Sequence, residues 1–411
     1  MTDRVCRNCD APLSVTFADL GMSPLSNAFV PPERARGMEP TYPLHAFVCG
    51  RCKLVQLEAV ETPEHIFSDY LYFSSFSPSW LRHAETYAAR VVQRFGLGPG
   101  HVAVEIASND GYLLRYLQQH GLRVLGVEPA ANVAAVARSK GVPSEVAFFG
   151  RETAERLLGR GDGADLITAN NVLAHVPDMH DFVAGFTILL KAQGVVTFEF
   201  PHLLRQMRET QFDTIYHEHF GYLSLHVVRR VLERHRLRVF DTEELPTHGG
   251  SLRVYVCHRD ANHGDQPAVA RVLGDETSAG LEDDELAAYR AFADQVDLVK
   301  TALLRFLLDA KDAGKRVVGY GAPAKGTTLL NYCGIRPDLL AFTVDRSPHK
   351  QGHLLPGVRI PVRSPEDLLA ARPDYVLILP WNLRDEIAGQ MAVVRDWGGK
   401  FVVPIPRLDV F

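Results

Sequence analysis

The stretch V-A-V-E-I-A-S-N-D-G at residues 102–111 decides the fold of the central part of this 411-residue chain. A short apolar run ends at Glu105, and a loop of small residues follows up to Gly111. A helical apolar pattern comes next, and a second apolar run at residues 124–127 ends at Glu128. Strand, tight loop, helix and strand open a doubly wound α/β sheet, which binds its ligands at the carboxyl ends of its strands. We therefore expect a binding site at this loop.

The loop favours a nucleoside ligand that has no pyrophosphate. It is not G-x-G-x-x-G, because Gly111 is its only glycine, so a close backbone approach to the pyrophosphate of NAD is poorly supported. Glu128 is placed to accept hydrogen bonds from a ribose. S-adenosylmethionine is the common ligand of this kind, and an ordinary βαβ unit with a solvated loop is the alternative. The residues expected to hold the ligand lie at strand ends: Glu105, Ala107, Asn109, Gly111, Glu128, Pro129, Phe149 and Asn171.

Bulk composition excludes several classes of protein. Hydrophobic residues make up 46% and charged residues 23% of the chain, and the net charge is −5, so no basic footprint points to nucleic acid. No apolar run approaches the ~20 residues that span a bilayer. The polar first residues lack the apolar core of a signal peptide, so we expect a cytoplasmic protein with reduced thiols. The sequence leaves the oligomeric state open, and a monomer is compatible with it.

Two cysteine pairs near the start predict a structural zinc site. Cys6 and Cys9 form one C-x-x-C knuckle, and Cys49 and Cys52 form a second. Four thiolates around one tetrahedral ion leave no open position for a catalytic water. The long segment between the pairs is rich in proline and poor in apolar residues, so a metal is a suitable staple for it.

The rest of the chain predicts a three-part α/β protein. We expect helices at 81–95, 130–140, 178–191 and 224–235, strands at 146–149, 165–171 and 195–200, and a final strand pair at 237–242 and 251–258. Five parallel strands with an antiparallel pair are typical of methyltransferases, whereas a nicotinamide-binding domain continues with a sixth parallel strand. The expected domains are residues 1–80, residues 81–260, a helical connector at 261–314 with a long helix at 281–313, and residues 315–411.

A second α/β pattern begins at the stretch V-V-G-Y-G-A-P-A-K-G, residues 317–326. A strand, a glycine-rich turn, a helix start and Lys325 together resemble a phosphate-binding loop, although neither common phosphate-loop pattern is matched. Later strands are expected at 340–345 and 375–380, the second of which leads into Trp381 and Asn382. Nucleotide or phosphate binding is one interpretation of this lobe, and a purely structural lobe is the other.

Residues 213–222, D-T-I-Y-H-E-H-F-G-Y, concentrate polar side chains in an apolar context, and we call them the histidine loop. A general base needs a pKa near the working pH, which an imidazole supplies, and a neighbouring carboxylate can orient its ring. His219, Glu218 and a tyrosine therefore form a candidate acid–base set. The alternatives are a metal held by His217 and His219, or an aromatic surface loop, since the stretch is not H-E-x-x-H.

Other polar residues at strand ends are expected to face the same crevice. His175 and His202 follow the fourth and fifth strands, and the turn H-G-G-S-L-R at residues 248–253 adds Ser251 and Arg253. An aromatic and hydroxyl-rich segment at residues 63–80 is either a hydrophobic lid or the source of a tyrosine that points into the site.

Taken together, five motifs resemble the S-adenosylmethionine-dependent sugar C-methyltransferases, over essentially the whole chain and in the same order. They are Cys6-x2-Cys9 with Cys49-x2-Cys52, E-I-A-S-N-D-G, Y-H-E-H-F-x-Y, H-G-G-S-L-R and G-Y-G-A-x-A-K-G, with Pro323 as a departure where a smaller residue is expected. Enzymes of this family act on nucleotide-linked deoxy-keto-sugars in antibiotic and cell-surface sugar pathways. The resemblance implies an N-terminal zinc-binding lobe, a central class I methyltransferase sheet and a C-terminal Rossmann-like lobe.

The resemblance also implies roles for individual residues. His219 is the base that removes a proton next to a C4 ketone, and the resulting enolate takes the methyl group. The side chains implied around the sugar are Tyr216, Glu218, His175 and an N-terminal tyrosine, for which Tyr70 is the first choice and Tyr72 the second. The further substrate-binding candidates are His202, Tyr222, Ser251, Arg253, Lys325, Trp381 and Asn382.

A dTDP-linked 4-keto-deoxysugar methylated at C3 is the leading expectation from the resemblance. Methylation at C5 and O- or N-methylation of a sugar are the runner-up reactions. A non-enzymatic zinc-knuckle interaction module fused to two degenerate nucleotide folds is the alternative outside enzymes, and an NAD-linked sugar oxidoreductase is a further one.

Overall fold

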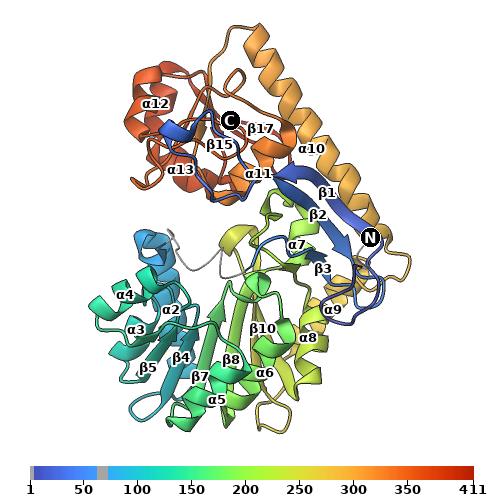
Figure 1. Ribbon diagram of the computed structural model, residues 1–411, viewed down its shortest axis with the longest axis vertical. Coiled ribbons are helices and arrows are strands. Elements are labelled where there is room, and N and C mark those ends of the chain that lie inside the picture. The colour runs from blue at the N-terminus through green and yellow to red at the C-terminus, as the bar shows by residue number, and fades with distance from the viewer. Residues whose placement is uncertain (1–3, 63–72) are drawn as a thin grey trace.

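The computed structural model describes residues 4–62 and 73–411. Two α/β lobes face each other, and a small sheet and the long helix α10 (Ala287–Asp312) run along one side of both (Figure 1). We call these parts the central lobe, the C-terminal lobe and the N-terminal lobe. Within the described residues, no helix combines the length and the apolar character that crossing a membrane requires.

The central lobe contains a seven-stranded sheet in the order β10-β11-β8-β7-β4-β5-β6. The strands β8, β7, β4, β5 and β6 are parallel, β11 is antiparallel to β8, and β10 is antiparallel to β11. Their bounds are β4 (Val102–Ile106), β5 (Arg123–Val127), β6 (Ser144–Glu145), β7 (Ala164–Asn170), β8 (Leu190–Pro201), β10 (Leu237–Leu245) and β11 (Ser251–His258). The expectation of five parallel strands with an antiparallel pair is confirmed.

Helices cover both faces of this sheet, and side-chain caps define where several of them begin. Ser77 accepts a hydrogen bond from the Trp80 amide at the start of α2, and Ser224 does the same for the Val227 amide in α8. Each such cap contributes about 1 kcal/mol. The helices are α2 (Pro78–Phe95), α3 (Leu114–Gln119), α4 (Ala131–Ser139), α5 (Arg151–Gly159), α6 (Met179–Leu189), α7 (Leu203–Arg208) and α8 (Leu225–Arg234).

One expectation about these elements is wrong, and a second needs its bounds corrected. The short strand expected at 146–149 lies at Ser144–Glu145, because the amides of Gly126 and Glu128 pair with the carbonyls of Pro143 and Glu145. The helix expected at 281–313 is α10, which begins at Ala287 rather than at residue 281, and a separate helix that was not expected, α9 (Pro267–Ser278), precedes it. Pro267 starts α9, where its missing N–H costs nothing, and Leu286 precedes α10 with a left-handed φ of 57°.

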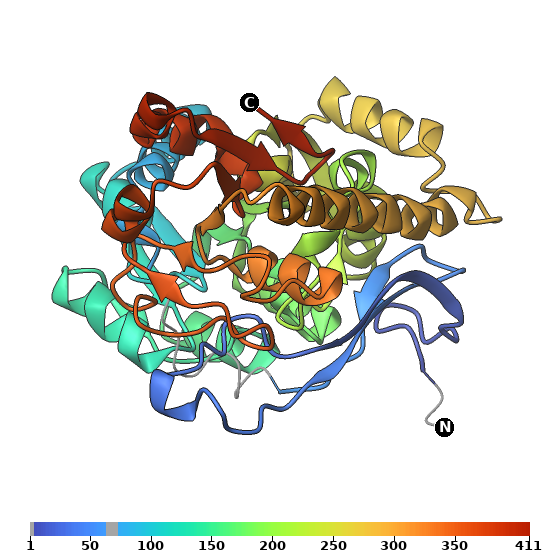
Figure 2. The same ribbon diagram turned by 90° about the horizontal axis from the view of Figure 1, so that it is seen from above.

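The N-terminal lobe is a four-stranded sheet that borrows one strand from the histidine loop. Its order is β1 (Val15–Ser23), β2 (Tyr42–Val48), β3 (Val55–Leu57) and β9 (Gly221–Tyr222). Phe17 of β1 stacks on Phe292 of α10 at 4.4 Å between ring centroids, and burying such a ring contributes about 2–3 kcal/mol. Between β1 and β2 the chain crosses to the C-terminal lobe, where Val30 bridges to Leu354 (Figure 2).

The C-terminal lobe is a second doubly wound sheet, in the order β14-β13-β12-β15-β16-β17, with only β17 antiparallel to its neighbour. Its strands are β12 (Val317–Tyr320), β13 (Thr343–Val344), β14 (Val362–Arg363), β15 (Tyr375–Ile378), β16 (Lys400–Val403) and β17 (Asp409–Val410). Its helices are α11 (Ala324–Cys333), α12 (Pro365–Ala371) and α13 (Arg384–Gln390). One continuous apolar core joins this sheet to α10 and to the N-terminal sheet, so the lobes are packed rather than loosely tethered.

Candidate active site

The loop after β4, which we call the donor loop (residues 107–111), has an unusual backbone. Ala107, Asn109 and Gly111 all have left-handed φ, at 52°, 51° and 76°. Such values are uncommon outside glycine and persist where surrounding contacts hold them. At Gly111 a Cβ would approach the Val142 side chain to 2.9 Å. Both this close contact and the left-handed φ favour glycine at this position. The turn brings its backbone close to the carboxyl end of β5.

Glu128, directly after β5, is held in place by two backbone amides. Its carboxylate accepts hydrogen bonds from the amides of Asn109 and Ala130, both at 2.9 Å. A carboxylate has about four lone-pair sites, so two remain for the hydroxyls of a ribose. Burial raises the pKa of Glu128, although both amides counter this. The role of Glu128 at a nucleoside site stays a prediction, with which these two hydrogen bonds are compatible.

Several buried carboxyl groups lie around the donor loop, and we call this region the donor site. Burial raises the pKa of Glu105 well above its usual value, and the nearby carboxylates of Glu128 and Asp110 raise it further. Glu105 Oε2 has no hydrogen-bond partner among the described residues, and the same is true of the side-chain oxygen of Asn171. Orphaned buried polar atoms next to a nucleoside loop fit a polar, cationic ligand such as a sulfonium nucleoside.

Three further donor-site residues have specific neighbours. Pro129 is half-buried directly after Glu128. Phe149, also half-buried, packs its ring against Phe182 and Phe186 of α6, at 5.6 and 5.1 Å between centroids. Asn109 accepts a hydrogen bond from the Ser74 amide at 2.8 Å, so the segment after residue 72 lies on the donor loop. The expected tyrosines, Tyr70 and Tyr72, fall outside the described residues.

The histidine loop places two imidazoles together. The rings of His219 and His175 meet edge to face at 4.7 Å between centroids. Nδ1 of His219 lies 2.8 Å from the Thr214 carbonyl, and Nδ1 of His175 lies 2.8 Å from the Glu218 carbonyl. A ring nitrogen that faces a carbonyl carries the proton, so both Nε2 atoms bear a lone pair in the neutral ring.

Burial keeps both rings neutral. It lowers the pKa of His175 to about 4 and that of His219 well below the usual value, where His175, His248 and Lys325 add to the effect. Within the part of the chain that the structure describes, Nε2 of His219 has no hydrogen-bond partner. A neutral imidazole with a fixed tautomer and an available Nε2 can accept a proton from a bound ligand.

The other expected residues of the histidine loop surround His219. The Tyr216 ring lies 4.0 Å from the His219 ring and the Tyr222 ring 6.2 Å from it, between centroids. Burial raises the pKa of Tyr222, so its phenol stays protonated. Burial also raises the pKa of Glu218 to about 7, against a hydrogen bond from Asn27 that lowers it. His217 instead points towards the N-terminal lobe, where Nε2 lies 3.2 Å from the Pro43 carbonyl.

The C-terminal lobe brings its three expected residues to the same place. Nζ of Lys325 donates to Asn382 at 2.9 Å and lies 4.7 Å from the centre of the Trp381 ring. The Trp381 indole donates to Asp213 of the histidine loop at 2.7 Å, which locks the two lobes together. Burial raises the pKa of Asp213 to about 6 and lowers that of Lys325. Lys325 retains donor capacity for an anionic group.

Three expected substrate residues have structural partners instead. His202 is buried and its Nε2 lies 2.7 Å from Glu276 of α9, so it does not face the crevice with His175. Ser251 donates to the Thr247 carbonyl at 3.0 Å. Arg253 is buried between Glu199 and Glu243, at 2.7 and 3.0 Å. The prediction for His202 was wrong because the end of a strand fixes the position of the backbone but not the direction of the side chain.

Sequence reasoning missed residues that arrive from elsewhere in the chain. Asn27 of the N-terminal lobe donates to Glu218 at 2.6 Å. His248 adopts a left-handed φ of 55°, and its ring meets Trp80 at 5.3 Å. Glu199, at the end of β8, bonds His83, Thr247 and Arg253. His248 lies within a quoted motif, which is a usable signal, but a lone asparagine carries none.

The four cysteines form a closed cluster in the N-terminal lobe. All four sulfurs lie within 4.8 Å of one another and all four residues are buried. Sγ of Cys6 lies 3.5 Å from Sγ of Cys52, and Sγ of Cys9 lies 3.5 Å from Sγ of Cys49, without disulfides. Amides and the Gln56 side chain donate to these sulfurs, as in metal knuckles. The donor set is that of a structural zinc site.

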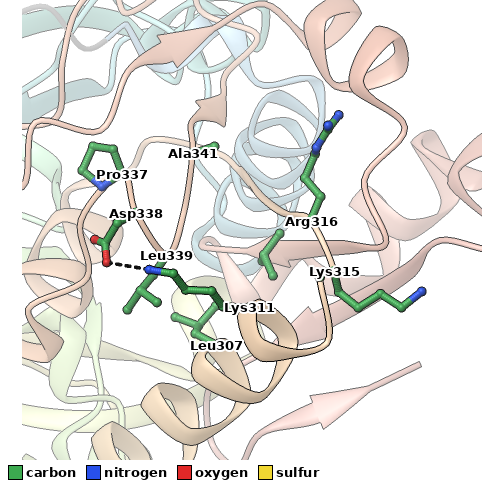
Figure 3. Close-up of a pocket in the computed structure, with 10 residues that line it drawn as sticks. Leu307, Lys311, Lys315, Arg316, Pro337, Asp338, Leu339 and Ala341 are labelled. Carbon is green, nitrogen blue, oxygen red and sulfur yellow. Dashed lines mark hydrogen bonds and ion pairs between the residues drawn. The ribbon is translucent and has the colours of Figure 1, made fainter.

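Two surface cavities lie away from this crevice. One of about 290 Å³ is lined by Lys311, Lys315, Arg316 and Asp338, among others (Figure 3). It opens beside the amino ends of the C-terminal lobe's strands, and Lys311 pairs with Asp338 across it at 3.1 Å. A second, of about 710 Å³, lies at the amino ends of the central strands near Arg94 and Lys191. Ligands of doubly wound sheets bind at the opposite edge.

The strand order, the donor loop and the four-cysteine cluster define a class I S-adenosylmethionine-dependent methyltransferase with a zinc-binding lobe. Family models agree, part by part: a zinc binding domain over residues 6–67, a methyltransferase domain over 80–241, and a C-methyltransferase C-terminal domain over 246–406. The chain is 38% identical to the C-methyltransferase NovU of Streptomyces niveus, over 98% of this chain and 95% of that protein. The chain belongs to the sugar C-methyltransferase family, and it is an enzyme that uses S-adenosylmethionine and zinc.

Other relatives match a smaller share of the chain. A ubiquinone biosynthesis O-methyltransferase of Methylobacterium sp. is 34% identical over 128 residues, which is 29% of this chain and 50% of that protein. Among solved structures, the magnesium protoporphyrin IX methyltransferase of Synechocystis PCC 6803 with bound SAM is 14% identical. It matches 49% of this chain and 100% of its own, with a TM-score of 0.36.

Proposed function

We propose that the enzyme methylates a carbon next to the ketone of a dTDP-linked 4-keto-deoxysugar, at C3, with His219 as the base. The observation that carries the proposal is the fixed tautomer of His219. Its Nδ1–H is held by the Thr214 carbonyl, and its Nε2 is available within a cluster of ionisable side chains. Methyl transfer to oxygen or nitrogen makes a smaller demand on the base, because those atoms already carry a lone pair that can attack the methyl group.

The first step is removal of a proton from a carbon made acidic by the neighbouring C4 ketone. Nε2 of His219 takes that proton, the C–H electron pair becomes an enolate, and the imidazole becomes cationic. Because burial lowers the pKa of His219, the ring is deprotonated before the step and ready to act at neutral pH. A positioned base of this kind accelerates a reaction by about 10²–10⁴-fold.

The enolate oxygen needs hydrogen-bond donors around it. Tyr216 and His175 both lie against the His219 ring, and Glu218 has a pKa of about 7, so its carboxyl group is partly protonated at neutral pH. A neutral carboxyl can donate a hydrogen bond, which a carboxylate cannot. Tyr70, or else Tyr72, is proposed as a further sugar contact from the aromatic segment.

The bound S-adenosylmethionine supplies an electrophilic methyl group, and the chain's part is to hold the molecule and exclude water. Glu128 is proposed to hold the ribose, and Glu105 and Asn171 to provide the orphaned oxygens for its polar groups. The remaining contacts are proposed for Ala107, Asn109, Gly111, Pro129 and Phe149. The buried acids of this site favour a cation.

The C-terminal lobe is proposed to hold the nucleotide end of the substrate. The charge of Lys325 contributes to lowering the pKa of His219, so an anion bound by Lys325 would lie within electrostatic range of the base. Trp381 and Asn382 fix the position of Lys325, and Tyr222 lines the sugar side. Methylation at C5 of the same substrate would use the same groups with the sugar ring turned.

Mass spectrometry of incubations with S-adenosylmethionine and a panel of dTDP-linked keto-sugars tests this proposal. We expect one added methyl group on a 4-keto-deoxysugar, and fragmentation that places it on carbon C3. Methylation of sugars that lack the ketone would contradict the proposal and favour O- or N-methylation.

A further inference from the structure

We propose that Asn27, a residue of the N-terminal lobe, is a positioning residue that orients the Glu218 carboxyl group towards the sugar. The inference rests on the function proposed above. Nδ2 of Asn27 donates to Oε1 of Glu218 at 2.6 Å, across 191 residues of sequence. In the described parts of the chain this is the only side-chain hydrogen bond to that carboxyl group, so Asn27 decides which oxygen faces the crevice.

The segment that carries Asn27 is fastened on both sides of it. Ser26 bonds Thr328 of α11 at 3.4 Å, and Thr328 in turn donates to the Ile215 carbonyl of the histidine loop at 3.1 Å. Val30 pairs with Leu354 through two backbone hydrogen bonds of 2.9 and 2.8 Å. The crossing of this segment from β1 to the C-terminal lobe is visible in Figure 2. Asn27 is therefore held at a junction of all three lobes.

The chemistry follows from which oxygen is occupied. An asparagine N–H can only donate, so Oε1 of Glu218 must accept, and a proton on Glu218 must reside on Oε2. Oε2 is then the oxygen that can donate to an oxygen of the sugar. Asn27 itself is exposed in the structure although its partner is buried, so the pair lies at the surface of the crevice.

Few ionisable groups compete for control of Glu218. The imidazoles of His217 and His219 lie on either side of it in the histidine loop, and His175 bonds its main-chain carbonyl. Burial raises its pKa to about 7 and the Asn27 hydrogen bond lowers it; no charged side chain among the described residues contributes. Removing Asn27 should therefore raise the pKa of Glu218 further.

Asn27→Ala tests the inference in the intact enzyme, with Asn27→Gln as the conservative variant and Ser26→Ala as the matched control. We expect Asn27→Ala to lower kcat about 10- to 100-fold, the cost of a misplaced catalytic group, with unchanged affinity for S-adenosylmethionine. Asn27→Gln should restore part of kcat. Ser26→Ala breaks a hydrogen bond of the neighbouring residue and should keep kcat within about 3-fold, because the Asn27–Glu218 contact remains.

Infrared titration of the Glu218 carboxyl group, assigned by subtracting the spectrum of Glu218→Gln, gives a readout that does not depend on turnover. We expect the protonated band to persist to higher pH in Asn27→Ala than in the unmodified protein and in Ser26→Ala. Equal titration in all three proteins, or equal losses of kcat in Asn27→Ala and Ser26→Ala, would overturn the inference. Failure of the proposed function is recognised separately, by absent methylation of every keto-sugar despite a normal shift of the band.

Discussion

The two doubly wound lobes present the same kind of loop with opposite chemistry. In the central lobe, the donor loop after β4 gives the Asn109 amide to Glu128, at the end of the next parallel strand, at 2.9 Å. In the C-terminal lobe, the loop after β12 gives the Ala322 amide to Asp345, at the end of β13, at 2.8 Å. Each loop thus meets an acid from the neighbouring strand.

The difference lies in what surrounds each acid. Glu128 is buried near Glu105 and Asp110, and the carboxylates of Glu128 and Asp110 add to the burial that raises the pKa of Glu105. Nζ of Lys350 lies 3.9 Å from a carboxylate oxygen of Asp345. The loop after β12, which bonds Asp345, leads directly into the first turn of α11, where Lys325 lies. A site of concentrated buried acid suits a cationic nucleoside, and a site that contains lysine side chains suits an anionic one. On the proposed function, one fold that is used twice holds the methyl donor in one lobe and the nucleotide of the substrate in the other.

The largest expected effect comes from replacing His219 of the histidine loop. His219→Gln should lower kcat by about 10²–10⁴-fold, because the base is lost while the shape of the site is kept. Its affinity for S-adenosylmethionine, measured by calorimetry, should stay within about 2-fold. His217→Gln is the matched control on the same loop and should retain most of kcat. Normal turnover by His219→Gln would refute the assignment of the base.

A second prediction concerns how the free energy of unfolding depends on pH, through the buried imidazole of His175 in the central crevice. Burial lowers the pKa of His175 to about 4, below its usual 6.5. Between these values the unfolded chain binds a proton that the folded protein rejects, so the free energy of unfolding falls as the pH drops from 6.5 to 4. The full contribution of His175 is about 3 kcal/mol.

Chemical denaturation of the unmodified protein and of His175→Asn, at several pH values, measures this contribution. The difference in the free energy of unfolding between the two should shrink on acidification from pH 6.5 to pH 4. A difference that does not change with pH would show that His175 is not held neutral by burial.

A third prediction compares the two acids directly. Glu128→Gln should weaken S-adenosylmethionine binding about 10- to 100-fold, because hydrogen bonds to a charged acceptor contribute about 1.5–3 kcal/mol, and leave KM for the nucleotide sugar nearly unchanged. Asp345→Asn should do the reverse. Calorimetric titration with each ligand decides the matter, and equal effects of both substitutions on both ligands would remove the division of labour between the lobes.

The smallest expected effect is at Lys325. Lys325→Met should raise KM for the nucleotide sugar about 5- to 10-fold, a loss of ~1 kcal/mol, with unaltered donor affinity. The loss should diminish at high salt, since screening already weakens the attraction in the unmodified enzyme. Lys315→Met, at the opposite edge of the same sheet, is the control. If the two variants raise KM equally, Lys325 has no specific contact with the substrate.

Much of the fold was predictable because its signals are local. The apolar runs around Glu105 and Glu128 and the two cysteine pairs follow directly from residue order, and the structure confirms the sheet type and the cysteine cluster. Element ends were less predictable: the strand expected at 146–149 is shifted to Ser144–Glu145 by pairing with β5, which is a tertiary effect.

The candidate site was predictable only where its residues share a motif. Tyr216, Glu218 and His219 are adjacent in sequence, so their cluster was visible at once. The direction of a side chain was not visible, which is why His202 and Arg253 were expected in the crevice and are instead held by Glu276 and by Glu199. Asn27 could not be found either, because its role depends on a chain crossing that only the folded lobes reveal.

Exchange of the sugar's α-proton with deuterated solvent, followed by NMR without any methyl donor, tests the central claim most directly. We predict that the unmodified enzyme exchanges the C3 proton of a dTDP-linked 4-keto-deoxysugar, and that His219→Gln does not. Methyl transfer without exchange capacity in the unmodified enzyme, or equal exchange in His219→Gln, would contradict the account.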